Sequence, residues 1–186
     1  MKNIQVSDIK TIRRLNQRVI DWHASKYPNV SCNEPSNKSL QAITDLSSAI
    51  LVPIEKQYGA FCITYGFTSA ILLREIKKKN PRGIAPSLDQ HAAHELNSEG
   101  NFFCNRLGAA CDFIVESHAS KMDQVANWVS QNLSFDRMYF YGVDRPLHVS
   151  FGPELNQFIQ IMEITSDGRR YPGKKGAGIT FDKVWI

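Results

Sequence analysis

The spacing of the hydrophobic residues changes along this chain, and that change limits the folds it can adopt. In residues 7–25 and 40–58 the apolar side chains recur at intervals of three and four, which predicts two amphipathic helices. Three later segments instead alternate apolar and polar residues, as strands do: 136–142, 146–152 and 158–165. Early helices followed by late strands predict an α+β fold with a mainly antiparallel sheet packed against N-terminal helices.

Shorter patterns organise the rest of the chain. Strands are predicted at 60–66 and 109–116, helices at 68–79 and 120–133, a polar turn at 166–178 and a last short strand at 179–186. Residues 80–106 show no period, and a loop of this length inside a compact domain is usually functional. We expect a helix-and-loop extension at 1–39 and one domain at 40–186 with a basic C-terminal turn, together forming a single compact unit.

Charge and composition argue against several classes of protein. The net charge of +4 is concentrated in residues 74–82 and 168–176, a pattern typical of a solvated helix end and a solvated loop. Aromatic residues do not interleave these runs in the pattern of a nucleic-acid-binding surface, so nucleic acid is not indicated as a partner. No apolar run is long enough to cross a membrane, and residues 1–19 lack the apolar centre of a secretory signal. A cytoplasmic location is therefore expected, while the oligomeric state stays open.

Four blocks of sequence, in order, carry a resemblance to a known family. They are "LQAITDLSSAILVPIEKQYGAFCITYGFTS" (40–69), "NRLGAACDF" (105–113), "WVSQNLSFDRMYFYG" (128–142) and "PLHVSFGP" (146–153). Together they resemble the zinc D-alanyl-D-alanine carboxypeptidases and dipeptidases, which cut peptidoglycan stem peptides and share their fold with the hedgehog signalling domain. The resemblance implies this fold, a bound zinc ion and a peptide or peptidoglycan-like substrate. A phage-type member would reach that substrate through a separate pore.

The resemblance also implies a ligand set, which this chain matches only in part. The family holds zinc with a His, an Asp seven residues later and a distant His, and leaves one coordination position open for water. Asp112 matches the Asp and His148 matches the last His, but Asn105 stands where the first His is expected. An amide is a poor zinc ligand beside imidazole. The chain therefore resembles a divergent member with an incomplete ligand set.

Two further family positions are changed. The family's catalytic base lies three residues before the last His, where this chain has Arg145, and the nearest acid is Asp144. The family's arginine that grips the substrate carboxylate is replaced by Thr68, which cannot form the bidentate contact. Thr68, Asn105 and Arg145 are thus the positions that the resemblance assigns to the substrate pocket, and Asp144 is one candidate base.

The missing ligand has candidates nearby in the sequence. The stretch "DQHAAHE" (89–95) contains His91 and His94, which one helical turn would place on the same side, and Glu95, a second candidate base. Cys104 is another candidate, because a thiolate is a strong zinc ligand. Cys111 is a poorer one, since it alternates with Asp112 along a strand and points to the opposite face.

Two functions follow from these residues. The first is a divergent metal-dependent hydrolase, a peptidase or amidase, with zinc held by Asp112, His148 and one of His91, His94 or Cys104. The alternative is a catalytically inactive binding module that keeps the fold without the metal. The amount of bound metal distinguishes the two.

Overall fold

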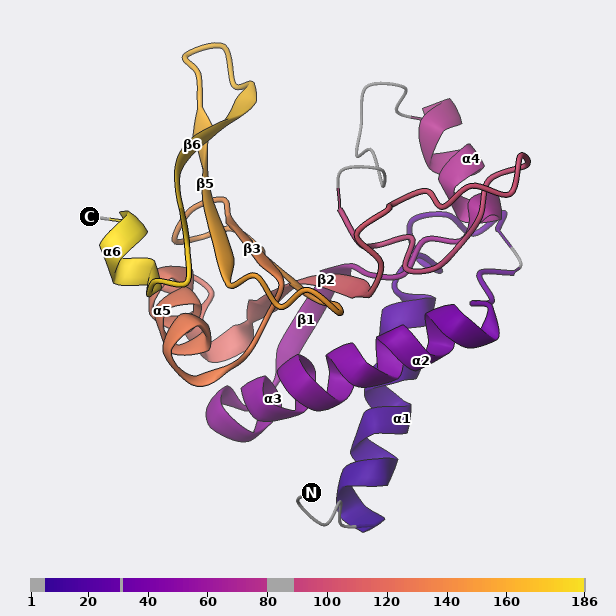
Figure 1. The fold of residues 1–186 in the computed structure, drawn as a ribbon, viewed down its shortest axis with the longest axis horizontal. Coiled ribbons are helices and arrows are strands. Elements are labelled where there is room, and N and C mark those ends of the chain that lie inside the picture. The colour runs from indigo at the N-terminus through magenta and orange to yellow at the C-terminus, as the bar shows by residue number, and fades with distance from the viewer. Residues whose placement is uncertain (1–5, 31, 80–88, 186) are drawn as a thin grey trace.

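The structure is a computed structural model that describes residues 6–30, 32–79 and 89–185. Its helices and its six strands form an α+β fold (Figure 1). The helices are α1 (Val6–Asp21), α2 (Asn37–Leu46), η1 (Ser47–Leu51), α3 (Val52–Tyr58), α4 (Ala70–Lys79), η3 (Glu116–His118), α5 (Met122–Asn132) and α6 (Phe181–Trp185). The strands are β1 (Phe61–Tyr65), β2 (Ala109–Val115), β3 (Arg137–Phe140), β4 (Leu147–Phe151), β5 (Phe158–Ile164) and β6 (Arg170–Ala177).

The second predicted helix is one helical path made of α2, η1 and α3. It begins at Asn37, earlier than predicted, because the Ser36 hydroxyl accepts a hydrogen bond from the Ser39 backbone N–H and caps the first turn. Its middle is a π-helical turn, which precedes Pro53. Proline has no N–H for the usual bond to the residue four positions earlier, so the wider turn accommodates it. Gly59, with a positive φ, ends the path directly after the predicted last residue, 58.

The sheet is mixed, which corrects the expectation of a mainly antiparallel one. Its strand order is β1-β2-β4-β3-β5-β6, and β3 and β5 pair in parallel. The reason is the short connection after β4. Strand β4 ends beside the first residue of β3. Residues 152–157 then pass that same end of β3, and β5 begins on the other side of β3 and runs parallel to it. Strand β3 therefore joins the β1-β2-β4 part of the sheet to the β5–β6 hairpin.

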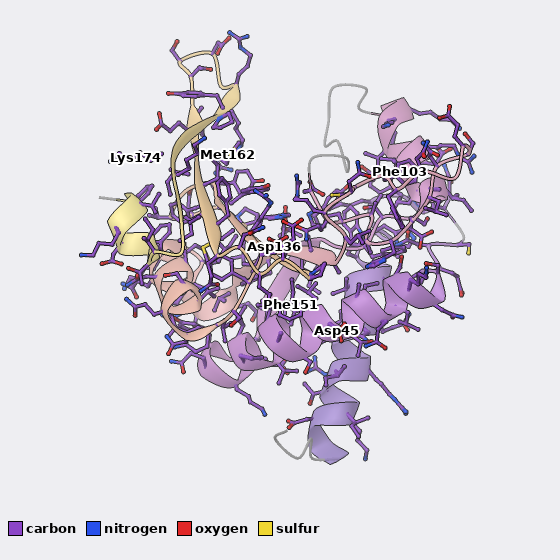
Figure 2. The ribbon with its side chains drawn as sticks, in the orientation of Figure 1. Asp45, Phe103, Asp136, Phe151, Met162 and Lys174 are labelled. Carbon is purple, nitrogen blue, oxygen red and sulfur yellow. The ribbon has the colours of Figure 1, made fainter. Side chains whose placement is uncertain are left out.

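The two faces of the sheet differ in polarity. One face carries the apolar residues that pack against α2, η1 and α5 in the main core, including Cys111, Phe113, Leu147, Val149, Met138 and Phe140. The other face carries a row of directly paired residues that crosses the sheet: Tyr65, Asp112, His148, Tyr139 and Gln160. Alternation along each strand produces this separation. Figure 2 shows Phe151 and Asp136 in the central part of the molecule, at the ends of these strands.

The C-terminal elements differ from prediction. Residues 170–177 form strand β6 instead of a polar turn, because backbone pairing with β5 needs no apolar pattern at an exposed sheet edge. The turn end of the β5–β6 hairpin extends away from the helices, whereas α6 packs beside its strands (Figure 1). Residues 181–185 form α6 instead of a strand, with Phe181 and Val184 buried one turn apart. Within the described ranges, no helix is long and apolar enough to cross a membrane.

Candidate metal centre

Asp112 and His148 lie opposite each other on the adjacent strands β2 and β4. The strand alternation that sends Cys111 and Val149 into the core turns Asp112 and His148 to the other face. The His148 ring stacks on Tyr139 of β3, with ring centroids 4.6 Å apart and an angle of 16° between the planes. The sheet therefore holds one carboxylate and one imidazole in fixed positions.

His91 reaches these two residues from the segment between α4 and β2. Its backbone carbonyl accepts a hydrogen bond from the Thr68 N–H, and its ring packs edge-on against Tyr65, 4.4 Å away. The preceding residue, Gln90, is fully buried and donates to the Leu107 carbonyl and to the Asp136 carboxylate at 2.8 Å. These anchors at the neighbouring residues fix where His91 can lie.

The three side chains converge on one carboxylate oxygen. Asp112 Oδ1 lies 3.0 Å from His91 Nε2 and 2.7 Å from His148 Nδ1. All three candidate ligand atoms lie within 4.8 Å of one another, and no other group of His, Cys, Asp or Glu in the described ranges meets that criterion. The imidazoles are buried, whereas 15% of the Asp112 side chain remains exposed. A cation bound here would be largely enclosed and reachable from the Asp112 side.

The hydrogen bonds of His91 show that a positive charge is favoured at Nε2, either a proton or a metal ion. His91 Nδ1 lies 3.1 Å from the Gly66 carbonyl oxygen, which can only accept a hydrogen bond, so Nδ1 carries a proton. In the neutral ring, Nε2 then directs a lone pair at the negative Asp112 oxygen, which is repulsive. Either a second proton on His91 or a metal ion near Nε2 removes that repulsion. A ligand histidine whose other nitrogen donates to a backbone carbonyl is the usual arrangement at metal sites.

The pKa values of His91 and Asp112 reflect the attraction between the imidazoles and the carboxylate. Burial alone lowers the pKa of His91, but the negative charges of Asp89 and Asp112, with the hydrogen bonds to Asp112 and Gly66, raise it above its ordinary value. Burial alone raises the pKa of Asp112, and the two histidines overcome this, so its pKa lies well below the usual range. Without a metal, the site therefore retains protons on imidazole beside an ionised carboxylate.

Two histidines and a carboxylate fit a divalent transition metal. This donor set, with three protein ligands, leaves a fourth tetrahedral position open, which is the pattern of catalytic zinc sites. The nitrogen-rich set disfavours calcium or magnesium, which prefer oxygen ligands. The donor chemistry and the geometry of the residues present thus agree with the zinc that the sequence led us to expect, while other divalent transition metals satisfy the same criteria.

The structure does not bring the other ligand candidates to this group. His94 turns away from His91 because Ala93, between them, has a positive φ of 48°, and His94 Nε2 accepts a hydrogen bond from the Gly108 N–H. Cys104 is buried as a free thiol in the turn that leads to Gly108. Asn105 lies exposed on that same turn. Of the candidates for the missing ligand, His91 alone lies beside Asp112 and His148.

The candidate bases are also placed elsewhere. Glu95 Oε1 accepts hydrogen bonds from the Ser36 N–H at 2.9 Å and the Ser39 hydroxyl at 2.7 Å, so this carboxylate holds the first turn of α2. Asp144 is exposed in the β3–β4 loop, where its only ion pair among the described residues is with Arg145, at 3.7 Å. Neither acid belongs to the cluster.

The residues predicted for the substrate pocket fall into two groups. Thr68 is fully buried, and its backbone N–H donates a hydrogen bond to the His91 carbonyl. Thr68 therefore positions a candidate metal-ligating residue and does not face a substrate. Asn105 and Arg145 are exposed, and the Arg145 N–H donates to the Gly142 carbonyl within the β3–β4 loop. No hydrogen bond or ion pair of the described residues joins the side chain of any of the three to His91, Asp112 or His148.

Two residues beside the cluster were missed at the level of sequence. Asp89, whose Oδ1 accepts the His91 N–H at 3.1 Å, adds a negative charge that raises the pKa of Tyr65, Tyr139 and His91. Tyr139 stacks on His148. A signal for Tyr139 was present, since the alternation of "RMYFY" places its tyrosines on one face. Asp89 had only its position in "DQH", directly before the ligand candidate.

Comparisons of this chain with family models, with curated proteins and with solved structures yield no match. What the site can do is therefore inferred from its own geometry and chemistry.

The site makes stability depend on pH in opposite ways with and without zinc. A raised His91 pKa contributes stability that is complete below the unfolded value of about 6.5 and is lost as pH rises through the folded pKa. Zinc must displace the proton from His91 Nε2, so zinc stabilises the protein more as pH rises. We expect the zinc-induced increase in Tm to grow from pH 5.5 to pH 8, measured by differential scanning fluorimetry. A zinc-induced increase in Tm that does not change with pH in wild type would contradict competition between zinc and the proton at His91 Nε2. In His91→Gln, the pH dependence of this increase should be absent.

Proposed function

We propose that this protein is a divergent zinc-dependent hydrolase that cleaves peptide or amide bonds. The observation that carries the proposal is the meeting of His91 Nε2 and His148 Nδ1 at one Asp112 oxygen, with the His91 tautomer fixed by Gly66. The order of sequence blocks supports the same class. In this interpretation the chain is related to the D-alanyl-D-alanine peptidases, and His91 takes the part of the ligand missing at Asn105.

The residues in and beside the cluster would have different roles: metal binding, orientation of a ligand and proton transfer. His91, Asp112 and His148 would hold the zinc, and the Gly66 carbonyl would keep the His91 lone pair directed at it. A zinc ion in such a site supplies a Lewis acid and lowers the pKa of bound water towards neutrality. Asp89 is the candidate base, because its carboxylate lies in the segment that borders the cluster and accepts the His91 backbone N–H at 3.1 Å. It would accept the proton of the attacking water and pass it to the leaving amine.

Zinc content and hydrolysis test this proposal together. Protein purified without a histidine tag should contain about one equivalent of zinc, and the zinc-loaded form should release fragments from a peptide pool or from peptidoglycan stem peptides, monitored by mass spectrometry. We expect Asp89→Asn to keep the zinc and to lower kcat by about 100-fold or more, as loss of a general base does. Glu95→Gln is the matched control and should change kcat less than about twofold.

The results that would contradict the proposal are equally definite. Less than about half an equivalent of zinc, with no change in Tm on adding zinc or a chelator, would favour the alternative of a binding module that keeps the fold without the metal. Bound zinc without hydrolysis of any peptide or amide would leave a metal site and remove the proposed reaction. Equal losses of kcat in Asp89→Asn and Glu95→Gln would remove Asp89 as the base.

A further inference from the structure

A groove runs along the outer side of α1, where this helix passes α2. It has a volume of about 590 Å³, and its lining includes Ile9, Arg13, Gln17 and Ile20 of α1 and Leu40 of α2. Residues at intervals of three and four lie on one side of a helix, so these α1 residues form one continuous stripe. Ile9 and Leu40 are 42% and 41% exposed, which leaves large apolar side chains open to a partner. We call this surface the α1–α2 groove.

The α1–α2 groove is separate from the metal centre. Helix α2 packs on the apolar face of the sheet, whereas Asp112 and His148 lie on its other face. The N-terminal turns of α1 project past α2 (Figure 1). A partner can therefore cover the groove without closing the metal centre.

The charges of α1 differ between its two sides. Two ion pairs join α1 to α3: Arg14 with Glu55, and Asp8 with Lys56. Lys10, Arg13 and Asp21, which lie within or beside the groove, form no ion pair with any residue in the described ranges. The groove side of α1 thus presents charges of both signs next to exposed apolar side chains.

The spacing of these residues makes the groove side of α1 complementary to itself. Ile9 and Ile20 are eleven residues apart, which is three helical turns, so both lie on one side and about 16 Å from each other. Lys10 and Asp21 are also eleven residues apart, on the adjacent flank. If a second α1 packs antiparallel, Ile9 meets Ile20 of the copy and Lys10 meets Asp21 of the copy. Twofold symmetry then repeats each contact, because such an interface uses the same surface on both chains.

We propose that the α1–α2 groove is the interface of a homodimer in which the two α1 helices pack antiparallel. In this register Arg13 lies opposite Gln17 of the second copy. The Gln17 Nε2 donates to Asp21 at 2.8 Å, and its Oε1 can accept from the guanidinium. The helix of an unrelated protein would have to supply an acid opposite Lys10 and a base opposite Asp21, whereas a second copy of this chain carries both. The inference goes beyond the proposed hydrolase and does not depend on it.

Sedimentation equilibrium of the full chain, from about 1 μM to about 500 μM, tests the interface. Wild type is expected to show a monomer–dimer equilibrium in this range. Lys10→Asp and Asp21→Lys should each weaken the dimer by about tenfold or more, because each substitution places like charges together at two symmetric positions. Lys77→Asp, on the exposed side of α4, is the matched control and should leave the equilibrium unchanged.

Mixing the two charge variants separates lost pairing from misfolding. An equimolar mixture of Lys10→Asp and Asp21→Lys should form a heterodimer with nearly wild-type affinity, since each contact again joins opposite charges. The two positions are about 16 Å apart on one helix and cannot pair within a molecule, so no effect on a single chain can produce this rescue.

Three results would overturn the inference. They are a wild-type protein that stays monomeric over the whole range, a dimer that neither charge variant weakens, and a mixture that fails to dimerise although both variants keep the wild-type circular dichroism spectrum. A dimer that forms equally in zinc-loaded and zinc-free protein would uphold the inference even if no peptide or amide is hydrolysed, so the two proposals stand or fall separately.

Discussion

Asp112→Asn is expected to remove the metal site while leaving the fold intact. Asp112 Oδ1 is the atom that both imidazoles approach, so its replacement takes away one ligand and the negative charge that attracts the cation. Loss of a group outside the ligand set typically costs 10–100-fold in metal affinity, and loss of a ligand should cost at least about 100-fold. At a zinc concentration that saturates both proteins, a 100-fold loss of affinity removes about 2.7 kcal/mol of zinc-dependent stability. Zinc content by mass spectrometry and Tm with and without zinc measure both effects.

Matched variants in the same segments make this prediction specific. His91→Gln should act like Asp112→Asn, whereas His94→Gln and Asn105→Ala should keep about one equivalent of zinc, because neither residue reaches the cluster. If His94→Gln lost the zinc and His91→Gln kept it, the ligand assignment would be wrong. Equal retention of zinc by Asp112→Asn and wild type would exclude the site altogether.

Gly108→Ala is expected to destabilise the protein by at least about 3 kcal/mol. Gly108 has a φ of 86°, where a residue with a Cβ atom is strained by about 1–2 kcal/mol. The new Cβ would also lie 2.2 Å from the Phe151 carbonyl oxygen and 2.5 Å from Gly152 Cα, and backbone atoms cannot move aside as the end of a flexible side chain can. For a chain of this size, Tm should fall by about 6 °C or more.

The chain offers a control for the strain alone. Gly168 has a similar φ of 80° at the β5–β6 hairpin, but a Cβ there would meet nothing within 4 Å. Gly168→Ala should therefore cost only about 1–2 kcal/mol. Equal losses of Tm in the two variants would mean that the contact between the Gly108 turn and β4 contributes nothing.

Elements with a clear local pattern were predicted well. The helical spacing in residues 7–25 and 40–58 corresponds to α1 and to the α2–η1–α3 path, which ends at the predicted residue, Tyr58. The alternation around Asp112 and His148 put both residues on the polar face of the sheet, because side-chain direction along a strand depends only on position within it. The C-terminal elements β6 and α6 were predicted wrongly, as a turn and as a strand. Strand β6 has no apolar pattern because its edge position needs only backbone bonds.

The sequence by itself determined the α+β composition and the end of the second helix at residue 58, since these follow from local spacing. The family resemblance, and not spacing, placed Asp112 and His148 in one site. The sequence left the third ligand open among His91, His94 and Cys104, because nothing in their spacing separates them. Only the tertiary structure decided for His91. The Ala93 backbone turns His94 away, and the Gly66 carbonyl and Thr68 N–H, distant in sequence, hold His91 towards Asp112. The parallel pairing of β3 with β5 was decided in the same way, since contacts between distant segments depend on how the whole chain packs.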